Sequence, residues 1–150
     1  MLRPILLVED NPKDLELTLV ALERGRLANE VVVARDGAEA LEYLFCRGAH
    51  QHRPNGNPAF VLLDLKLPKV DGLQVLETIK SDPDLRHVPV VMLTSSREEQ
   101  DLLRSYRLGV NAYVVKPVGF QEFLEAVQEV GGFWAVLNEP PPGMPRPGLG

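Results

Sequence analysis

Five side chains that can take part in chemistry each follow a short apolar run in this sequence. They comprise two adjacent carboxylates, a third carboxylate, a hydroxyl and an ammonium, namely Glu9, Asp10, Asp64, Thr94 and Lys116. Three carboxylates brought together repel one another and need a counter-charge. Mg²⁺ suits such a group, because it takes a few carboxylate oxygens and leaves the rest of its coordination sphere to water and phosphate. With a lysine and a hydroxyl to bind phosphoryl oxygens, the set suits phosphoryl transfer to a carboxylate nucleophile.

The apolar runs before these residues determine whether the side chains can meet. Uninterrupted apolar runs are typical of strands buried on both faces of a parallel sheet. We expect such strands at residues 5–8, 30–34, 60–63, 88–93 and 112–115. The carboxyl ends of parallel strands share one edge of the sheet, and ligands bind in the crevice where the strand order reverses. The five polar residues are therefore expected to gather there.

Amphipathic segments separate the predicted strands. Helix-start signals follow three of them, at Asn11-Pro12, Asp36 and Asp71-Gly72. A helix over Glu98–Leu108 is expected to end at Gly109. Five strands alternating with five helices predict a single α/β domain, doubly wound around an open parallel sheet with helices on both faces.

Composition and charge exclude several classes of protein. The 150 residues are 45% hydrophobic and 25% charged, which is typical of one globular domain. A net charge of −5 argues against nucleic-acid binding, and we find neither an 18-residue apolar span nor a signal peptide. Cys46 is the only cysteine, which excludes an internal disulfide and fits a reduced cytoplasm. We interpret it as a core cysteine on a helix.

The three histidines form no metal-ligand spacing with that cysteine. His50 and His52 lie in the polar stretch Arg47–Pro58, which is predicted to be a solvated loop, and His87 precedes a strand. The sequence also lacks an ATP-binding pattern, so we expect a separate kinase to supply any phosphoryl group.

Each member of the polar set also has an ordinary interpretation. Asp10 can help to cap the first helix, Thr94 can be a strand-end residue with nothing to bind, and Lys116 can be a surface lysine. Their shared position at strand ends favours a common site. Asp71 is interpreted as a helix cap.

In this order the motifs resemble the receiver domain of the two-component response regulators. The match runs from Ile5 to about Val130, and its motifs are Glu9-Asp10, Asp64 followed by Leu67-Pro68 and Asp71-Gly72, Thr94, and Lys116-Pro117. The resemblance implies the flavodoxin-like sheet order 2-1-3-4-5. It also implies a receiver domain over residues 1–130, followed by a C-terminal extension over 131–150.

The resemblance implies a phosphoacceptor and a set of metal ligands. Asp64 would accept the phosphoryl group, while Asp10 and Asp64 would bind Mg²⁺ directly. Glu9 would reach the ion through water, and the backbone carbonyl of Lys66 would be a further ligand.

The resemblance also implies a conformational switch. Thr94 and Lys116 would hold the phosphoryl oxygens, and the Lys116–Pro117 bond is expected to be cis. Tyr113 matches the aromatic residue that turns inward when Thr94 moves. Lys66 and Ser96 are expected to tune how long the phosphate survives.

The implied function is that of a single-domain regulator in a phosphorelay. It would take a phosphoryl group from a sensor histidine kinase, signal by a change of conformation, and catalyse only its own phosphorylation and dephosphorylation. The long loop Arg47–Pro58 and the pair Phe133-Trp134 resemble the stand-alone regulators encoded beside bacterial phytochrome kinases.

Two other functions are compatible with parts of this pattern. A haloacid dehalogenase-type phosphatase also has an aspartate nucleophile, but it carries a second acid two residues later, where this chain has Lys66. A receiver that no longer accepts phosphate would act as a scaffold. Retention of all five polar residues argues against that alternative.

An apolar segment beyond the last predicted helix suggests assembly. Phe120, Phe123, Leu124 and Val127 account for one buried helix face, yet the segment Phe133–Leu137 continues as FWAVL before a proline-rich tail. It can fold back over its own domain or form a contact surface. We expect a homodimer that uses this region.

Overall fold

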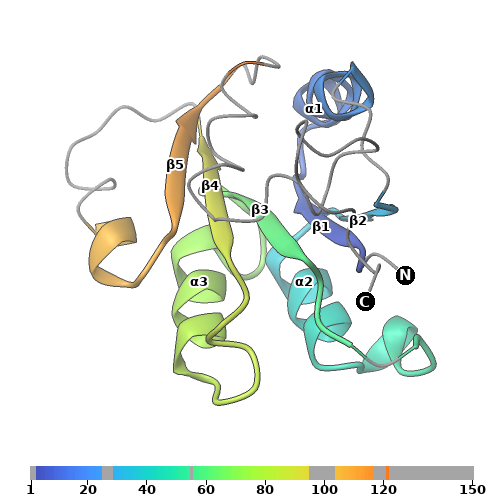
Figure 1. Ribbon diagram of the computed structural model, residues 1–150, viewed down its shortest axis with the longest axis vertical. Coiled ribbons are helices and arrows are strands. Elements are labelled where there is room, and N and C mark those ends of the chain that lie inside the picture. The colour runs from blue at the N-terminus through green and yellow to red at the C-terminus, as the bar shows by residue number, and fades with distance from the viewer. Residues whose placement is uncertain (1–2, 25–28, 55, 95–103, 117–120, 122–150) are drawn as a thin grey trace, which may run out of the picture.

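Five short strands form one parallel sheet in the order β2-β1-β3-β4-β5 (Figure 1). In this computed structural model the strands are β1 (Ile5–Val8), β2 (Val31–Ala34), β3 (Phe60–Asp64), β4 (Val90–Thr94) and β5 (Ala112–Val115). The structure describes residues 3–24, 29–54, 56–94, 104–116 and 121, with the backbone alone for Thr94. The order reverses at β1 and β3, which is where the site was expected. The predicted fold class and strand order are confirmed.

The strand side chains alternate between two hydrophobic cores. On one face, Leu6, Val61 and Met92 pack with helices α2 (Gly37–Leu44) and α3 (Gly72–Ser81). On the other face, Leu7 and Leu62 pack against α1 (Pro12–Arg24). Figure 1 shows α2 and α3 on one side of the sheet and α1 on the other. Burial on both faces explains the uninterrupted apolar runs in the sequence.

The predicted caps begin all three helices. Asn11 Oδ1 accepts from the backbone N–H groups of Lys13 and Asp14, and Asp36 Oδ1 accepts from that of Glu39. A reciprocal pair of hydrogen bonds joins Asp71 and Gln74 at the start of α3. These side chains satisfy N–H groups that have no partner inside the helix.

Cys46 does not lie on a helix, contrary to the prediction. Helix α2 ends at Leu44, and Cys46 follows in the left-handed region with φ of 54°. Its N–H donates to the Tyr43 carbonyl, while the N–H of Arg47 donates to that of Glu42. This is the Schellman pattern with a cysteine in the place usually taken by glycine. Cys46 is half-buried there and is not a core residue.

Gly109 ends a helical segment in the expected manner. Residues 104–107 are helical, and Gly109 has φ of 95°. The N–H of Val110 donates to the Ser105 carbonyl and that of Gly109 to the Tyr106 carbonyl, which is again the Schellman pattern. Four further predictions fall outside the described residues: the role of Ser96, the start of this helix at Glu98, the cis bond at Pro117 and the segments beyond it.

The stretch Arg47–Pro58 is more ordered than the solvated loop that its composition predicts. It contains a short 3₁₀ helix, Gly48–His50, and Arg53 ties the rest of it to the end of α2. The Arg53 guanidinium lies 4.2 Å from the centre of the Tyr43 ring and donates to four backbone carbonyls, those of Tyr43, Leu44, Pro54 and Gly56. The planar guanidinium can donate to several carbonyls at once, and the amino-acid composition of the loop does not predict these contacts.

Across the described residues, no helix is both long and apolar enough to cross a membrane.

Candidate functional site

Three carboxylates meet at the carboxyl edge of the sheet. Glu9 and Asp10 follow β1, Asp64 ends β3, and these two strands are neighbours. One carboxylate oxygen from each of the three residues lies within 4.8 Å of the others. Glu9 and Asp64 are buried and Asp10 is exposed, so the cluster opens to solvent on one side. The sequence-based expectation that these acids converge is confirmed.

Lys116 supplies the counter-charge from the end of β5. Its ammonium forms an ion pair with Glu9 Oε1 and another with Asp64 Oδ2 at 3.1 Å. The lysine side chain is 8% exposed, so these pairs are largely screened from water. Burial alone lowers the pKa of Lys116, but its hydrogen bond to Glu9 and the charges of Asp64 and Glu9 outweigh that effect and leave the pKa raised. Lys116 is therefore charged at neutral pH.

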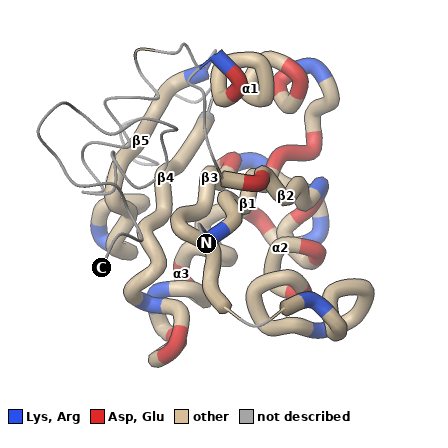
Figure 2. Tube along the Cα trace, turned by 45° about the vertical axis from the view of Figure 1, so that its right-hand side comes forward, with Lys and Arg blue, Asp and Glu red and all other residues tan. Residues whose placement is uncertain are grey.

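Asp14 is a third partner of Lys116 that the sequence analysis missed. It lies in the first turn of α1, and its Oδ2 is 3.2 Å from the Lys116 ammonium. Figure 2 shows acidic and basic positions close together where the end of β5 approaches the start of α1. The two residues are 102 positions apart, and no local motif links them. Asp14 resembled an ordinary acid near a helix N-terminus.

Burial strongly affects the protonation of Glu9. Desolvation, with a hydrogen bond to Asp64, raises the pKa of Glu9 to about 7, although its contact with Lys116 opposes the shift. Its Oε1 is buried and accepts no well-oriented hydrogen bond from the described residues, even though it pairs with the ammonium. A buried carboxylate oxygen that lacks such a donor suits a cation.

A glycine allows α3 to start directly beneath Asp64. A Cβ on Gly72 would lie 2.2 Å from the backbone oxygen of Asp64 and 2.8 Å from Cα of Leu65. The N–H of Gly72 also donates to the Leu65 carbonyl at 3.0 Å. Asp71-Gly72 therefore acts as a cap and as a point of close approach, which fixes the loop that carries Asp64.

Three further predicted residues, Thr94, Tyr113 and Lys66, lie on β4, on β5 and after β3. Thr94 ends β4, and its backbone pairs with Val115, one residue before Lys116. Tyr113 is half-buried on β5 and packs against the core shared with α2 and α3. The backbone N–H of Lys66 donates to Asp64 Oδ1 at 3.4 Å. The carbonyl role of Lys66 and the switch roles of Thr94 and Tyr113 stay predictions.

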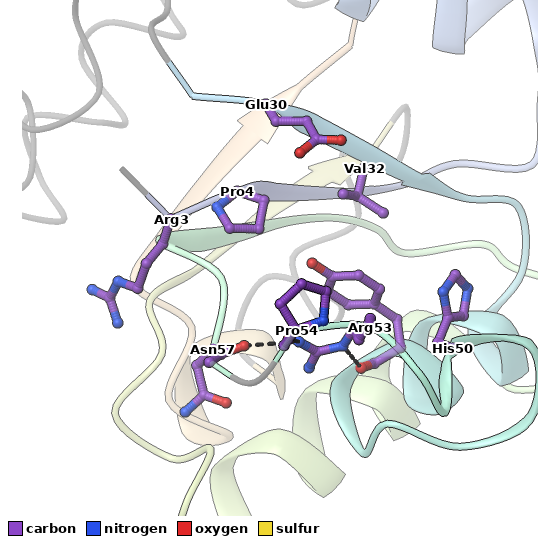
Figure 3. Close-up of a pocket in the computed structure, with 10 residues that line it drawn as sticks. Arg3, Pro4, Glu30, Val32, His50, Arg53, Pro54 and Asn57 are labelled. Carbon is purple, nitrogen blue, oxygen red and sulfur yellow. Dashed lines mark hydrogen bonds between the residues drawn. The ribbon is translucent and has the colours of Figure 1, made fainter. Parts of the chain in front are cut away.

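A cavity lies at the opposite edge of the sheet, where β1 and β2 begin. This cavity has a volume of about 450 Å³. Figure 3 shows Pro4 and Val32 on the strand side, facing Arg53 and Pro54 of the loop after α2. Arg53 is already bound to backbone carbonyls, and no cluster of three metal-ligating side chains among the described residues lies at this edge. The convergent chemistry is therefore at the carboxyl edge.

The residues at the carboxyl edge fit a hard divalent cation. They offer carboxylate oxygens from two neighbouring strands, and one side is open for water and a phosphoryl group. A lysine contacts Glu9 and Asp64, where it can pair with phosphoryl oxygens. Acids, lysine and strand-end position together support phosphoryl chemistry on Asp64.

Comparison with known proteins agrees with this geometry. Residues 5–128 match the family described as Response regulator receiver domain. The bacteriophytochrome response regulator AtBRR has a solved structure with 72% sequence identity and a TM-score of 0.85, covering 93% of this chain and 99% of that one. For RtBRR, another bacteriophytochrome response regulator, the identity is 66% and the TM-score 0.86, with coverage of 95% and 86%.

A cyanobacterial regulator is a more distant relative. Response regulator Rcp1 of Synechocystis sp. is 41% identical over 130 residues, which are 87% of each chain. A crystal structure of the Mn²⁺-bound form of response regulator Rcp1 has a TM-score of 0.74 at 37% identity, covering 97% of this chain and 99% of that one. Members of this family are signalling proteins phosphorylated on an aspartate and are not conventional enzymes. The chain belongs to the response regulator receiver domains.

Proposed function

We propose that Asp64 is the aspartate that accepts the phosphoryl group. The observation that carries this proposal is the contact of Asp64 with the Lys116 ammonium, at 3.1 Å, within the same cluster as the carboxylates of Glu9 and Asp10. Glu9 and Asp64 both belong to the ion pairs with Lys116 and to the acidic cluster, and of these two Asp64 has the more exposed side chain, at 7% against 0%. A phosphoryl group on Asp64 would therefore lie near the ammonium and near any cation that the cluster holds.

The transfer exchanges one bond to phosphorus for another. An oxygen of Asp64 attacks the phosphorus of a phosphohistidine, the P–N bond breaks, and its electron pair leaves with the imidazole nitrogen, which then takes a proton. Lys116 neutralises charge on the phosphoryl oxygens while the phosphoryl group moves from the histidine nitrogen to the Asp64 oxygen. Mg²⁺ held by Glu9, Asp10 and Asp64, with the carbonyl of Lys66, would supply the remaining positive charge. The Thr94 hydroxyl would donate to a phosphoryl oxygen.

The phosphoryl donor in this proposal is a sensor histidine kinase. Two close relatives are bacteriophytochrome response regulators, so a bacterial phytochrome kinase is the donor class that similarity favours. The chain has no ATP-binding pattern of its own to replace it.

Phosphorylation would be read out on the fourth and fifth strands. A Thr94 hydroxyl drawn towards the phosphoryl oxygens would vacate space that the Tyr113 ring can fill. Both residues lie on neighbouring strands, and β4 pairs with β5 along its length. We propose that this movement changes the surface beside β5, which is what a partner recognises.

The region after residue 130 would serve assembly. We propose a receiver domain over residues 1–130 and an extension over 131–150 whose apolar segment FWAVL pairs two copies. A dimer would present two acceptor sites to a dimeric kinase. Light scattering on the full chain and on a form ending at Val130 tests this. The same number of chains per particle in both forms would contradict it.

A small phosphodonor tests the acceptor assignment without the kinase. Acetyl phosphate and Mg²⁺ should add one phosphoryl mass to the wild-type chain, and chelator or Asp64→Asn should prevent it. A wild-type chain that never gains this mass would instead be a scaffold receiver. Uptake by Asp64→Asn at the wild-type rate would move the acceptor to another residue.

A further inference from the structure

The Lys116 ammonium forms ion pairs with three carboxylates. A lysine carries three donors and no acceptor. In this structure its partners are Glu9, Asp64 and Asp14, from the end of β1, the end of β3 and the first turn of α1. To remain beside Asp64 when other groups enter the site, the ammonium must keep at least one of these partners.

Asp14 differs from the other two partners because it is not part of the acidic cluster. The cluster that can hold a cation consists of Glu9, Asp10 and Asp64. Asp14 lies on the helix instead, where its N–H is fixed by Asn11 Oδ1 at 3.1 Å. Its side chain is 34% exposed, against 0% for Glu9 and 7% for Asp64. A cation in the cluster would thus compete for two of the three lysine partners but not for Asp14.

We propose that Asp14 is a positioning residue that holds Lys116 beside Asp64 when a divalent cation takes over Glu9 and Asp64. This inference rests on the proposed function of Asp64. A cation and an ammonium that share the same carboxylates repel each other, and the ammonium moves away unless another negative group holds it. Asp14 provides that group at 3.2 Å, and it is not one of the clustered acids.

Loss of Asp14 should therefore have two measurable effects. In Asp14→Asn the ammonium has only the carboxylates that the cation needs, so it competes with Mg²⁺ and weakens binding by roughly threefold or more. With Mg²⁺ saturating, Lys116 is no longer held beside Asp64, and phosphorylation by acetyl phosphate slows by roughly three- to tenfold. Calorimetry measures the first effect and intact mass against time the second.

Two control variants distinguish the positioning of Lys116 by Asp14 from the loss of one negative charge on α1. Glu16→Gln removes the same charge from the same helix at an exposed residue that forms no ion pair with the described residues, and it should match wild type in both measurements. Asp14→Glu keeps the carboxylate and should recover part of both losses.

A double-mutant cycle with Lys116 is the decisive experiment. If Asp14 acts through the lysine, Asp14→Asn has no further effect on Mg²⁺ affinity or transfer rate in a Lys116→Met background. Equal losses in both backgrounds would overturn the inference, as would a single Asp14→Asn variant that matches wild type. If Lys116→Met does not fold, failure of Asp14→Glu to recover any activity overturns it instead. A wild-type chain that takes no phosphate on Asp64 would refute the proposed function itself.

Discussion

Two basic side chains organise opposite edges of the sheet, and different kinds of acceptor hold them. At the carboxyl edge, Lys116 pairs with the carboxylates of Glu9, Asp14 and Asp64. At the amino edge, Arg53 donates to four backbone carbonyls and lies over the Tyr43 ring. One cation is surrounded by excess negative charge, whereas the other is surrounded by neutral dipoles.

This difference separates a site that can react from a contact that only holds a loop. Backbone carbonyls cannot change charge, and their positions follow from the fold. Carboxylates can be protonated, can pass from an ammonium to a metal ion, and can accept a phosphoryl group. The excess of acids over Lys116 leaves the carboxyl edge with negative charge that a cation can neutralise. Metal and pH are therefore expected to act on the carboxyl edge alone.

Removing the ammonium should have the largest effect on stability. Lys116→Met leaves the buried carboxylates of Glu9 and Asp64 without a counter-charge, so in chelator we expect a loss of about 3 kcal/mol in the free energy of unfolding. Mg²⁺ should restore most of this loss, because it replaces the missing charge. Phosphorylation should still be slower by about 100-fold. Denaturant titrations with Mg²⁺ and with chelator measure the first part, and equal losses in both would contradict it.

The matching variant at the other edge should not respond to metal. Arg53→Met breaks the hydrogen bonds to backbone carbonyls and should cost about 2 kcal/mol. Arg53→Lys should recover only part of this cost, because an ammonium lacks the planar fork. The same titrations should give the same loss with Mg²⁺ and with chelator. If Mg²⁺ restored the unfolding free energy lost in Arg53→Met, the two edges would not differ in their response to metal.

The pH dependence should also come from the carboxyl edge. In metal-free protein the pKa of Glu9 rises from 4.5 to about 7, so between these values the folded chain binds more protons than the unfolded chain. This group therefore makes stability fall as the pH rises from 4.5 to 7, by up to about 3 kcal/mol. Unfolding of wild type and Glu9→Gln in chelator measures the slope. An equal slope in the two proteins would remove Glu9 as its source.

The smallest effect concerns an acid that shares the carboxyl edge but caps a helix. Asp71→Ala removes the reciprocal cap at the start of α3 and should cost about 1 kcal/mol. Its oxygens are outside the acidic cluster, so Mg²⁺ affinity should be unchanged. A fall in affinity as large as that of Asp64→Asn would place Asp71 in the metal site.

Much of this arrangement follows from local sequence patterns. Apolar runs located the strands, and the residue after each run located Glu9, Asp64 and Lys116, because strand direction alone brings these side chains to one edge. Asp14 and Arg53 were missed for a different reason. The contact of Asp14 with Lys116 depends on how α1 lies beside the end of β5. The partners of Arg53 are backbone carbonyls, which every residue type has, so the sequence does not indicate which ones it binds. Cys46 was misplaced because a non-glycine residue takes the left-handed position that ends α2.

Chemical mapping of the phosphorylated residue tests the central claim most directly. Borohydride reduces an aspartyl phosphate to homoserine, so treatment of the phosphorylated chain leaves a mass change at the acceptor. Peptide sequencing by mass spectrometry should find homoserine at position 64, and none there when acetyl phosphate or Mg²⁺ is left out. Homoserine at Asp10 or Asp14 with an unchanged Asp64 would contradict the account.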